Sequence, residues 1–246
     1  MVNVVRVKLL KGIKRFPLFT VKDHMSFIMT SADMEGKTPS DQQQILDEVL
    51  DILFPGLSRT EQECAFVKCY CASFGKNAIK VGIRSAKGVS ETFMIIHDYD
   101  LQNEYAVDEN VTLGFTFPAG RGESEKVFLE CISYVIHNGT KYTWESLEEE
   151  TKNNILDLVT MEDMEQIVLM LTKSCHVTVR DSTLHTLSPL FKVLFNKAEM
   201  MEFFKTNYLL NKNSLNIDNM MNCSPMERSI YIALLSEDLK NRKESA

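Results

Sequence analysis

Apolar residues repeat with the helical period of about 3.6 residues in three successive segments near the start of the chain. Thr20, Thr38 and Ser58 each precede one segment, and each is followed three residues later by an acidic residue. A hydroxyl at the cap accepts from free amides of the first turn and the acid reaches back, so each pair predicts a helix start. The predicted inner faces of the second and third helices are Ile45, Leu46, Val49, Leu50, Ile52 and Leu53, and Phe66, Val67, Tyr70 and Phe74.

Alternation of apolar and polar residues, which is typical of strands, follows the third helix. Gly75 is expected to end that helix, because glycine adopts the left-handed conformation common at a helix C-terminus. Residues 79–84 and 91–96 are then predicted to form a hairpin, and residues 111–117 a further strand. The first ten residues alternate in the same way and predict one more strand. Residues 99–110 are acidic, lack the pattern and are predicted to be a loop.

The second half of the chain returns to helical patterns, interrupted by a brief alternation at residues 175–180. The last helix begins with Ser224-Pro225-Met226-Glu227, a full capping box with proline at the first helical position. Its buried face is predicted to be Ile230, Tyr231, Leu234 and Leu235. Asn138-Gly139 is a typical tight-turn pair. The helices predicted in this half cover residues 124–136, 144–159, a segment capped by Thr160, 197–210 and 225–240.

These elements predict an α+β protein that is mostly helical, with a small antiparallel hairpin or three-stranded subdomain. Helical patterns resume after residue 117, which suggests two parts. Residues 1–117 would be an N-terminal helical unit with the small β subdomain. Residues 118–246 would be a mostly helical C-terminal unit, and we expect the two to pack as one body.

Composition narrows the class of protein. The chain has 246 residues, of which 44% are apolar and 25% charged, as in soluble globular proteins. Its formal charge of −7 argues against broad nucleic-acid binding, which needs a basic face. The start of the chain does not have the pattern of a signal peptide, and no apolar run approaches a membrane helix. We therefore expect a cytosolic protein whose six cysteines are reduced.

Candidate chemistry is sparse. The chain has no nucleophile elbow, phosphate-binding loop, dinucleotide fingerprint or zinc-protease helix, so we assign no catalytic, cofactor-binding or metal residue and expect no enzyme and no cofactor. Cys175, His176 and His185 could supply three zinc ligands, but a fourth is missing and a structural hairpin is favoured. His97-Asp98-Tyr99-Asp100 favours a turn at a strand end over a metal site. The cysteines of the third helix, Cys64, Cys69 and Cys71, are expected to pack in the core.

Charge is distributed unevenly along the chain. The first 15 residues hold a basic arm, which either is a solvated strand face or docks on an acidic partner or nucleic acid; it consists of Arg6, Lys8, Lys11, Lys14 and Arg15. The loop at residues 98–109 is acidic, and helix capping does not account for it, so it suits charge-steered docking to another protein. Its acids are Asp98, Asp100, Glu104, Asp108 and Glu109.

Five stretches of the chain, taken together, suggest a family. They are PLFTVKD, QQILDEVLDILF, LSRTEQECAFVKCYCASFGK, YTWESLEEETKNNILDLVTMEDMEQIVLML and CSPMERSIYIALLSEDLK. These stretches resemble the T4-type phage baseplate protein family, whose members are small proteins of the baseplate hub and its assembly. The resemblance covers most of the chain in the right order. Some family members carry a cysteine pair in the middle hairpin, but the matching turn here is Ser85-Ala86-Lys87-Gly88, so no metal role transfers.

The resemblance implies a non-enzymatic protein that docks to other baseplate hub proteins while the hub is built, as a hub component or as an assembly chaperone that leaves. It places the chain in the host cell cytoplasm or in the tail baseplate of the virion. A nucleic-acid-binding module that uses the basic arm is the alternative from another class, and a cryptic zinc enzyme at Cys175, His176 and His185 is a further one.

Overall fold

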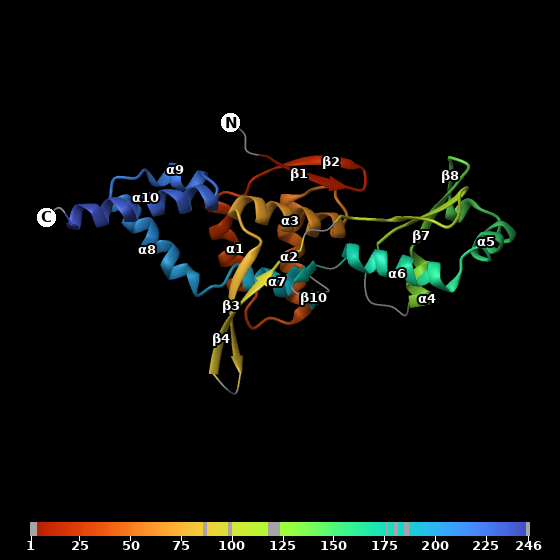
Figure 1. Cartoon of the computed structure of the whole chain (residues 1–246), viewed down its shortest axis with the longest axis horizontal. Helices are drawn as coiled ribbons and strands as arrows, with labels where there is room; N and C mark the ends of the chain where they lie inside the picture. Colours follow the sequence, from red (N-terminus) through yellow and green to blue (C-terminus); the bar gives the residue numbers. More distant parts are fainter. Residues whose placement is uncertain are drawn as a thin grey trace. The chain divides into compact units, whose positions relative to one another are not determined.

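The computed structural model describes residues 4–85, 88–97, 100–117, 124–175, 177–179, 182–184 and 187–244. The chain divides into two compact units (Figure 1). The first comprises residues 1–7, 13–97 and 187–246, and the second comprises residues 8–12 and 98–186. Helices predominate and the sheets are small and antiparallel, which confirms the predicted α+β class. The boundary predicted after residue 117 lies inside the second unit, which spans residues 98–186. The residues from 187 onward belong to the first unit again.

The first unit is built on three helices that begin at the predicted caps. They are α1 (Val21–Asp33), α2 (Pro39–Leu53) and α3 (Arg59–Phe74). The Thr20 amide donates to the Asp23 carboxylate at 2.7 Å, and the Asp23 amide donates back to the Thr20 hydroxyl at 3.2 Å. Gly75 follows α3 with φ of 63°, so the left-handed helix end is confirmed.

Burial on these helices follows the predicted faces with one correction. Leu46 and Leu50 on α2 and Phe66 on α3 are fully buried. Ile52, which was assigned to the inner face of α2, is instead 80% exposed. It lies two residues beyond Leu50, and two residues turn an α-helix through about 200°, which places the side chain on the opposite face.

Aromatic rings from distant segments form the core of the first unit. Helix α7 (Leu187–Leu194) contributes Phe191, whose ring centroid lies 5.7 Å from that of Phe66. Phe195, just after α7, lies 5.0 Å from Phe27 of α1. The hydrophobic core therefore depends on residues far along the chain. Three more helices follow in this unit, α8 (Glu199–Lys212), α9 (Ile217–Asn222) and α10 (Pro225–Glu244).

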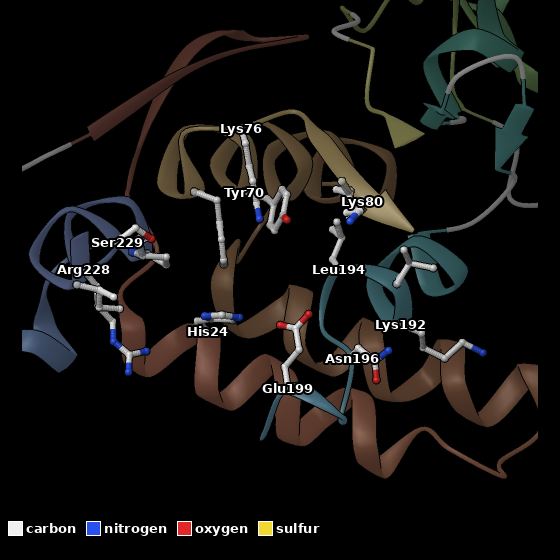
Figure 2. Close-up of a pocket in the computed structure, with 15 residues that line it drawn as sticks. His24, Tyr70, Lys76, Lys80, Lys192, Leu194, Asn196, Glu199, Arg228 and Ser229 are labelled. Carbon is white, nitrogen blue, oxygen red and sulfur yellow. Dashed lines mark hydrogen bonds between the residues drawn. The ribbon is translucent and has the colours of Figure 1, made fainter. Parts of the chain in front are cut away.

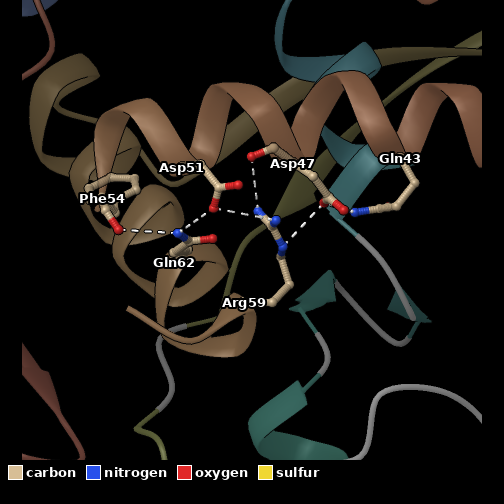
Figure 3. Close-up of polar contacts among 6 residues, drawn as sticks. All are labelled: Gln43, Asp47, Asp51, Phe54, Arg59 and Gln62. Atoms are coloured by element: carbon tan, nitrogen blue, oxygen red, sulfur yellow. Dashed lines mark hydrogen bonds and ion pairs between the residues drawn. The ribbon is translucent and has the colours of Figure 1, made fainter. Parts of the chain in front are cut away.

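A polar cluster joins the end of α2 to the start of α3 (Figure 3). Arg59 forms ion pairs with Asp47 at 3.2 Å and with Asp51 at 3.5 Å. Gln62 donates to the Asp51 carboxylate at 2.9 Å and to the Phe54 carbonyl at 3.1 Å. Because these bonds engage both helices, they hold the turn between them in a single geometry.

Three hairpins accompany the helices. Strands β1 (Val4–Leu9) and β2 (Gly12–Pro17) pair near the start of the chain, and β2 was not predicted. Strands β3 (Ala78–Ser85) and β4 (Gly88–Ile95) form the predicted antiparallel hairpin; its turn at residues 86–87 lies outside the described residues. Strands β9 (Val177–Val179) and β10 (Ser182–Leu184) pair within the second unit.

The second unit holds a four-stranded antiparallel sheet in the order β5-β6-β7-β8. The buried core of this unit includes Leu113, Val135, Ile167 and Leu171. Its strands are β5 (Glu104–Ala106), β6 (Val111–Phe115), β7 (Ile132–His137) and β8 (Thr140–Thr143). Its helices are α4 (Ser124–Cys131), the short 3-10 helix η1 (Trp144–Ser146), α5 (Glu149–Leu156) and α6 (Met161–Cys175).

The helix predicted over residues 144–159 is present only as η1 and the shorter α5. Two further sequence predictions are wrong in this unit. The helix predicted over 124–136 stops at Cys131, and the remainder is strand β7. Asn138 and Gly139 both have positive φ, 47° and 77°, so they form the tight turn that returns the chain as β8. The predicted loop at 99–110 contains strand β5, which pairs with β6. In both cases pairing with β6 determines the conformation, and the local sequence pattern does not.

Candidate docking surface

Helix α10 begins at the predicted capping box. The Ser224 amide donates to the Glu227 carboxylate at 2.8 Å, and the Glu227 amide donates to the Ser224 hydroxyl at 3.2 Å. Pro225 occupies the first helical position, where its missing N–H has no partner to lose. These local bonds fix where α10 starts, and they set the direction in which its residues face.

The inward face of α10 holds a buried cation, Arg228, as well as the half-buried Ile232 and Leu235, and of these the sequence predicted only Leu235. Arg228 is only 6% exposed; its guanidinium lies over the Phe203 ring at 4.4 Å and donates to the Asn207 side chain.

Ile230 and Leu234 lie two and six residues after Arg228, so they are on the outward side of the helix. They are 52% and 57% exposed. Their predicted burial is wrong. Tyr231, also predicted to be buried, is exposed as well.

Exposed apolar residues on α10 form a stripe with helical spacing. Met226, Ile230 and Leu234 occur at intervals of four residues, so they lie along one face of the helix. We call these three residues the α10 stripe. A face of this kind is normally covered in a folded protein.

Helix α8 has a comparable arrangement. Phe203 and Leu210 face inward and are buried, whereas Met201, Phe204 and Tyr208 are exposed. The three exposed residues are spaced by three and four positions, which again places them along one helix face. Two of the last helices of the chain therefore present apolar residues outward.

A groove of about 750 Å³ lies between α10 and the end of α8. Tyr231 and Leu234 line one side together with the charged residues Glu237 and Arg242, and Leu215 lies among the residues that follow α8. Apolar and charged groups meet in this groove, as they do at protein–protein interfaces with an apolar centre and a polar rim.

The basic arm is exposed in the structure. Arg6 and Lys8 lie on β1, Lys14 and Arg15 on β2, and Lys11 in the turn between the strands. Lys8 lies 3.6 Å from the Asp100 carboxylate, so one basic residue and one acidic residue that were singled out separately form an ion pair.

The described acidic residues at 98–109 are exposed, and some of them also make local contacts. Glu104 accepts a hydrogen bond from the Tyr134 hydroxyl at 2.6 Å, and burial together with this bond raises the pKa of Tyr134 to about 12. Asp108 accepts from the Asn110 and Val111 amides at 2.7 Å each, which shapes the turn before β6. Glu109 is exposed, and Asp98 lies outside the described residues. At least two of these acids therefore have local structural roles.

In the described part of the chain, no group of three or more His, Cys, Asp or Glu side chains could hold a metal ion. His176 and His185, and the side chain of Cys175, lie outside the residues described. Cys69 is buried in α3, and burial raises the pKa of its thiol to about 12, as expected for a core cysteine. Among the described helices, none is both long and apolar enough to cross a membrane.

Sequence reasoning missed the outward faces of α8 and α10 because helical periodicity reports only that one face is apolar. It does not report whether that face packs inside the chain or against another molecule. The sequence carried no signal for this, because an arginine opposite an apolar stripe is also typical of a helix with one core face and one solvent face. The burial of Arg228 appears only in the structure.

Two family models match consecutive parts of the chain, and the second match covers the last helices. Residues 1–189 match the family model described as T4 bacteriophage base plate protein. Residues 194–240 match the model described as baseplate hub assembly protein Gp51 C-terminal domain. This range includes all of α8 with its exposed apolar residues, and most of α10 with the α10 stripe. Comparison with curated proteins gave no match, and comparison with solved structures gave none either.

Proposed function

Since the chain belongs to the T4 bacteriophage base plate protein family, we propose that it helps to build the tail baseplate hub by docking to another baseplate protein through α8 and α10. The family match supports a role in baseplate hub assembly. The docking mode and the surface are our proposal. Binding alone would carry out this role, so the proposal includes no catalytic step.

The observation that carries the proposal is the exposed α10 stripe. Ile230 and Leu234 are each more than half exposed, and both lie within the segment that matches the hub assembly domain. Fully burying one such side chain contributes about 1.5–3 kcal/mol, so covering the stripe would supply a substantial part of a binding free energy. A partner with an apolar helix face would fit this surface.

Charge would act on the rate of this association more than on its strength. The basic arm carries five exposed cations on the β1–β2 hairpin, and opposite charges on a partner would speed the encounter. We expect the exposed arm to steer docking and the apolar stripe to hold the partner. High salt would therefore slow association while leaving dissociation nearly unchanged.

Co-expression with the other baseplate proteins tests the docking surface. We expect a double variant, Ile230→Ser with Leu234→Ser, to lose co-purification with its partner. Ile52→Ser is the matched control, because Ile52 is an exposed isoleucine on a helix outside the proposed surface. All variants should unfold at nearly the wild-type denaturant midpoint, since none of these side chains is buried. Undiminished co-purification of the double variant would remove the α10 stripe from the proposal.

Mass spectrometry of finished particles separates a hub component from an assembly factor that leaves. A stoichiometric amount of this chain in purified virions would make it a component. Its absence from virions, together with its presence in purified hub intermediates, would make it a transient chaperone.

The basic hairpin keeps one alternative function open for testing. Five cations on two paired strands could contact phosphates, although the net charge of −7 opposes such binding. Retention of DNA at physiological salt, lost when Lys11 and Lys14 are changed to glutamine, would favour a nucleic-acid-binding module. It would count against docking if no baseplate protein bound the wild type.

A further inference from the structure

A pocket of about 450 Å³ opens in the first unit where elements from both family-matched segments meet (Figure 2). His24 of α1, Tyr70 of α3 and Lys76 come from the first matched segment. Glu199 of α8 and Arg228 of α10 come from the second. A ligand in this pocket would therefore contact both parts of the first unit.

Cationic side chains outnumber acidic ones around the pocket. Lys76, Lys80 and Arg228 line it, and Glu199 is the one carboxylate among the lining residues. Lys192 contributes its aliphatic stem, because its ammonium donates to the Gln42 side chain at 2.8 Å and points away from the centre in Figure 2. The formal charge at the pocket is thus positive.

Two ionisable groups in the pocket respond to this environment. Burial, together with the charges of Arg228 and Lys76, lowers the pKa of His24 to about 4. His24 is therefore neutral at physiological pH. Burial raises the pKa of Glu199, and Lys76 partly offsets that effect. Both shifts reflect the partial enclosure of the site, and the shift of His24 also reflects its positive charge.

Arg228 has donor capacity that its described neighbours do not use. It is 94% buried, and its Nε has no hydrogen-bond partner among the described residues. The guanidinium is closed to solvent and lies on Phe203 and Asn207, and in Figure 2 it points away from the pocket centre, so Arg228 contributes positive charge and not a hydrogen bond to a ligand. The donors that a ligand would meet are the Lys76 and Lys80 ammonium groups. A carboxylate is acceptor-only and accepts from ammonium groups, so it matches these donors.

We propose that this pocket binds a carboxylate side chain from an acidic segment of a protein partner. The inference goes beyond the docking proposed above, because it concerns a different surface and does not require the α10 stripe. The pocket is concave and holds its own carboxylate, Glu199, while the chain as a whole carries −7. These features disfavour a polyanionic nucleic-acid backbone and suit a single acidic side chain.

Fluorescence anisotropy with a labelled hexaglutamate peptide, acetylated and amidated at its ends, tests the proposal on the full-length protein. A hexaglutamine peptide is the matched neutral probe, and a single-stranded oligonucleotide is the alternative polyanion. Lys76→Gln should weaken peptide binding about three- to tenfold, because it removes one attractive charge from a partly enclosed site. Glu199→Gln should strengthen it by a similar factor, since it removes the one repulsive charge.

Strengthening by Glu199→Gln is the discriminating result, because damage to the fold does not produce tighter binding. Lys205→Gln is the control: Lys205 is an exposed lysine on α8 that pairs with Glu202 at 2.7 Å and does not line the pocket. The Ile230→Ser, Leu234→Ser protein should bind the peptide normally, so failure of either proposal is seen separately. Equal affinity for hexaglutamine, or no change in either pocket variant, would overturn the inference. Oligonucleotide binding that Lys76→Gln abolishes would also overturn it, in favour of nucleic acid.

Discussion

Glu63 has a carboxyl group that the fold holds in an unfavourable state at neutral pH. It is 9% exposed, and burial raises its pKa from 4.5 to about 7, although Arg59 and a backbone hydrogen bond from Leu187 act in the opposite direction. The folded state therefore binds the proton more tightly than the unfolded state does. This contribution to stability is fully present below about pH 4.5 and is lost as the pH rises through about 7.

Glu63→Gln should remove this pH dependence. We expect the variant to be more stable than the wild type at pH 8 by on the order of 2 kcal/mol, and the difference to shrink towards pH 5. Urea titrations of both proteins at the two pH values measure it. A constant difference across this range would mean that Glu63 ionises normally in the folded protein.

Phe66 and Leu50 are fully buried at the centres of their helix faces, as their spacing predicts. Replacing either with alanine should lower the free energy of unfolding by about 2–5 kcal/mol, from lost apolar contact and the cavity left behind. Denaturant titration checks this, with Ile52→Ala as the exposed control on the same helix as Leu50. A loss below about 1 kcal/mol at Phe66 would contradict the aromatic core described here.

At the scale of the element, the β7–β8 hairpin shows that one apolar spacing is compatible with either a helix or a strand. Residues 132–136 continue the apolar spacing of α4, yet they form a strand, because β6 pairs with them. The turn at Asn138 and Gly139 then requires positive φ at both positions. Glycine suits this conformation because it has no Cβ.

Gly139→Ala tests the tight turn that the Asn138-Gly139 pair predicts and that joins β7 to β8. At φ of 77° a Cβ is strained even though nothing lies within 4 Å of it, so we expect a loss of about 1–2 kcal/mol. In a helical segment the same change would stabilise the protein, since alanine is the better helix former. Thermal unfolding of the second unit, followed by tryptophan fluorescence at Trp144, provides the measurement, and a gain in stability would contradict the hairpin.

At the scale of the whole molecule, the core of the first unit is complete only when α7 and the residue after it pack against α1 and α3. Phe191 and Phe195 are fully buried and contact rings of α1 and α3. A chain that ends at residue 186 would expose Phe27 and Phe66. We expect this truncated protein to lose the cooperative unfolding transition of the first unit and to bind a hydrophobic dye.

The second unit should remain folded in the truncated protein, because its core lies within residues 111–171. Amide resonances of Leu113 and Val135 should therefore stay dispersed and protected from exchange. A truncated chain with the wild-type unfolding profile would show that α7 is dispensable for the core, contrary to its burial.

The sequence by itself determined the features that depend on neighbours within a few residues. The caps at Thr20, Thr38, Ser58 and Ser224, and the left-handed end at Gly75, were all predicted. Their hydrogen bonds and backbone conformation involve residues three or four positions apart, so the chain encodes them locally. The family resemblance was also present in these stretches, and the family matches confirm it.

Only the tertiary structure decided which apolar faces are buried. Ile230 and Leu234 belong to a helical stripe like that of Leu50, yet they are exposed, while Arg228 is buried against Phe203. Burial depends on which segment arrives from elsewhere in the chain, and periodicity carries no information about that arrival. The candidate docking surface and the pocket between Lys76, Glu199 and Arg228 arise for the same reason: both need residues that the fold brings together from positions far apart in sequence.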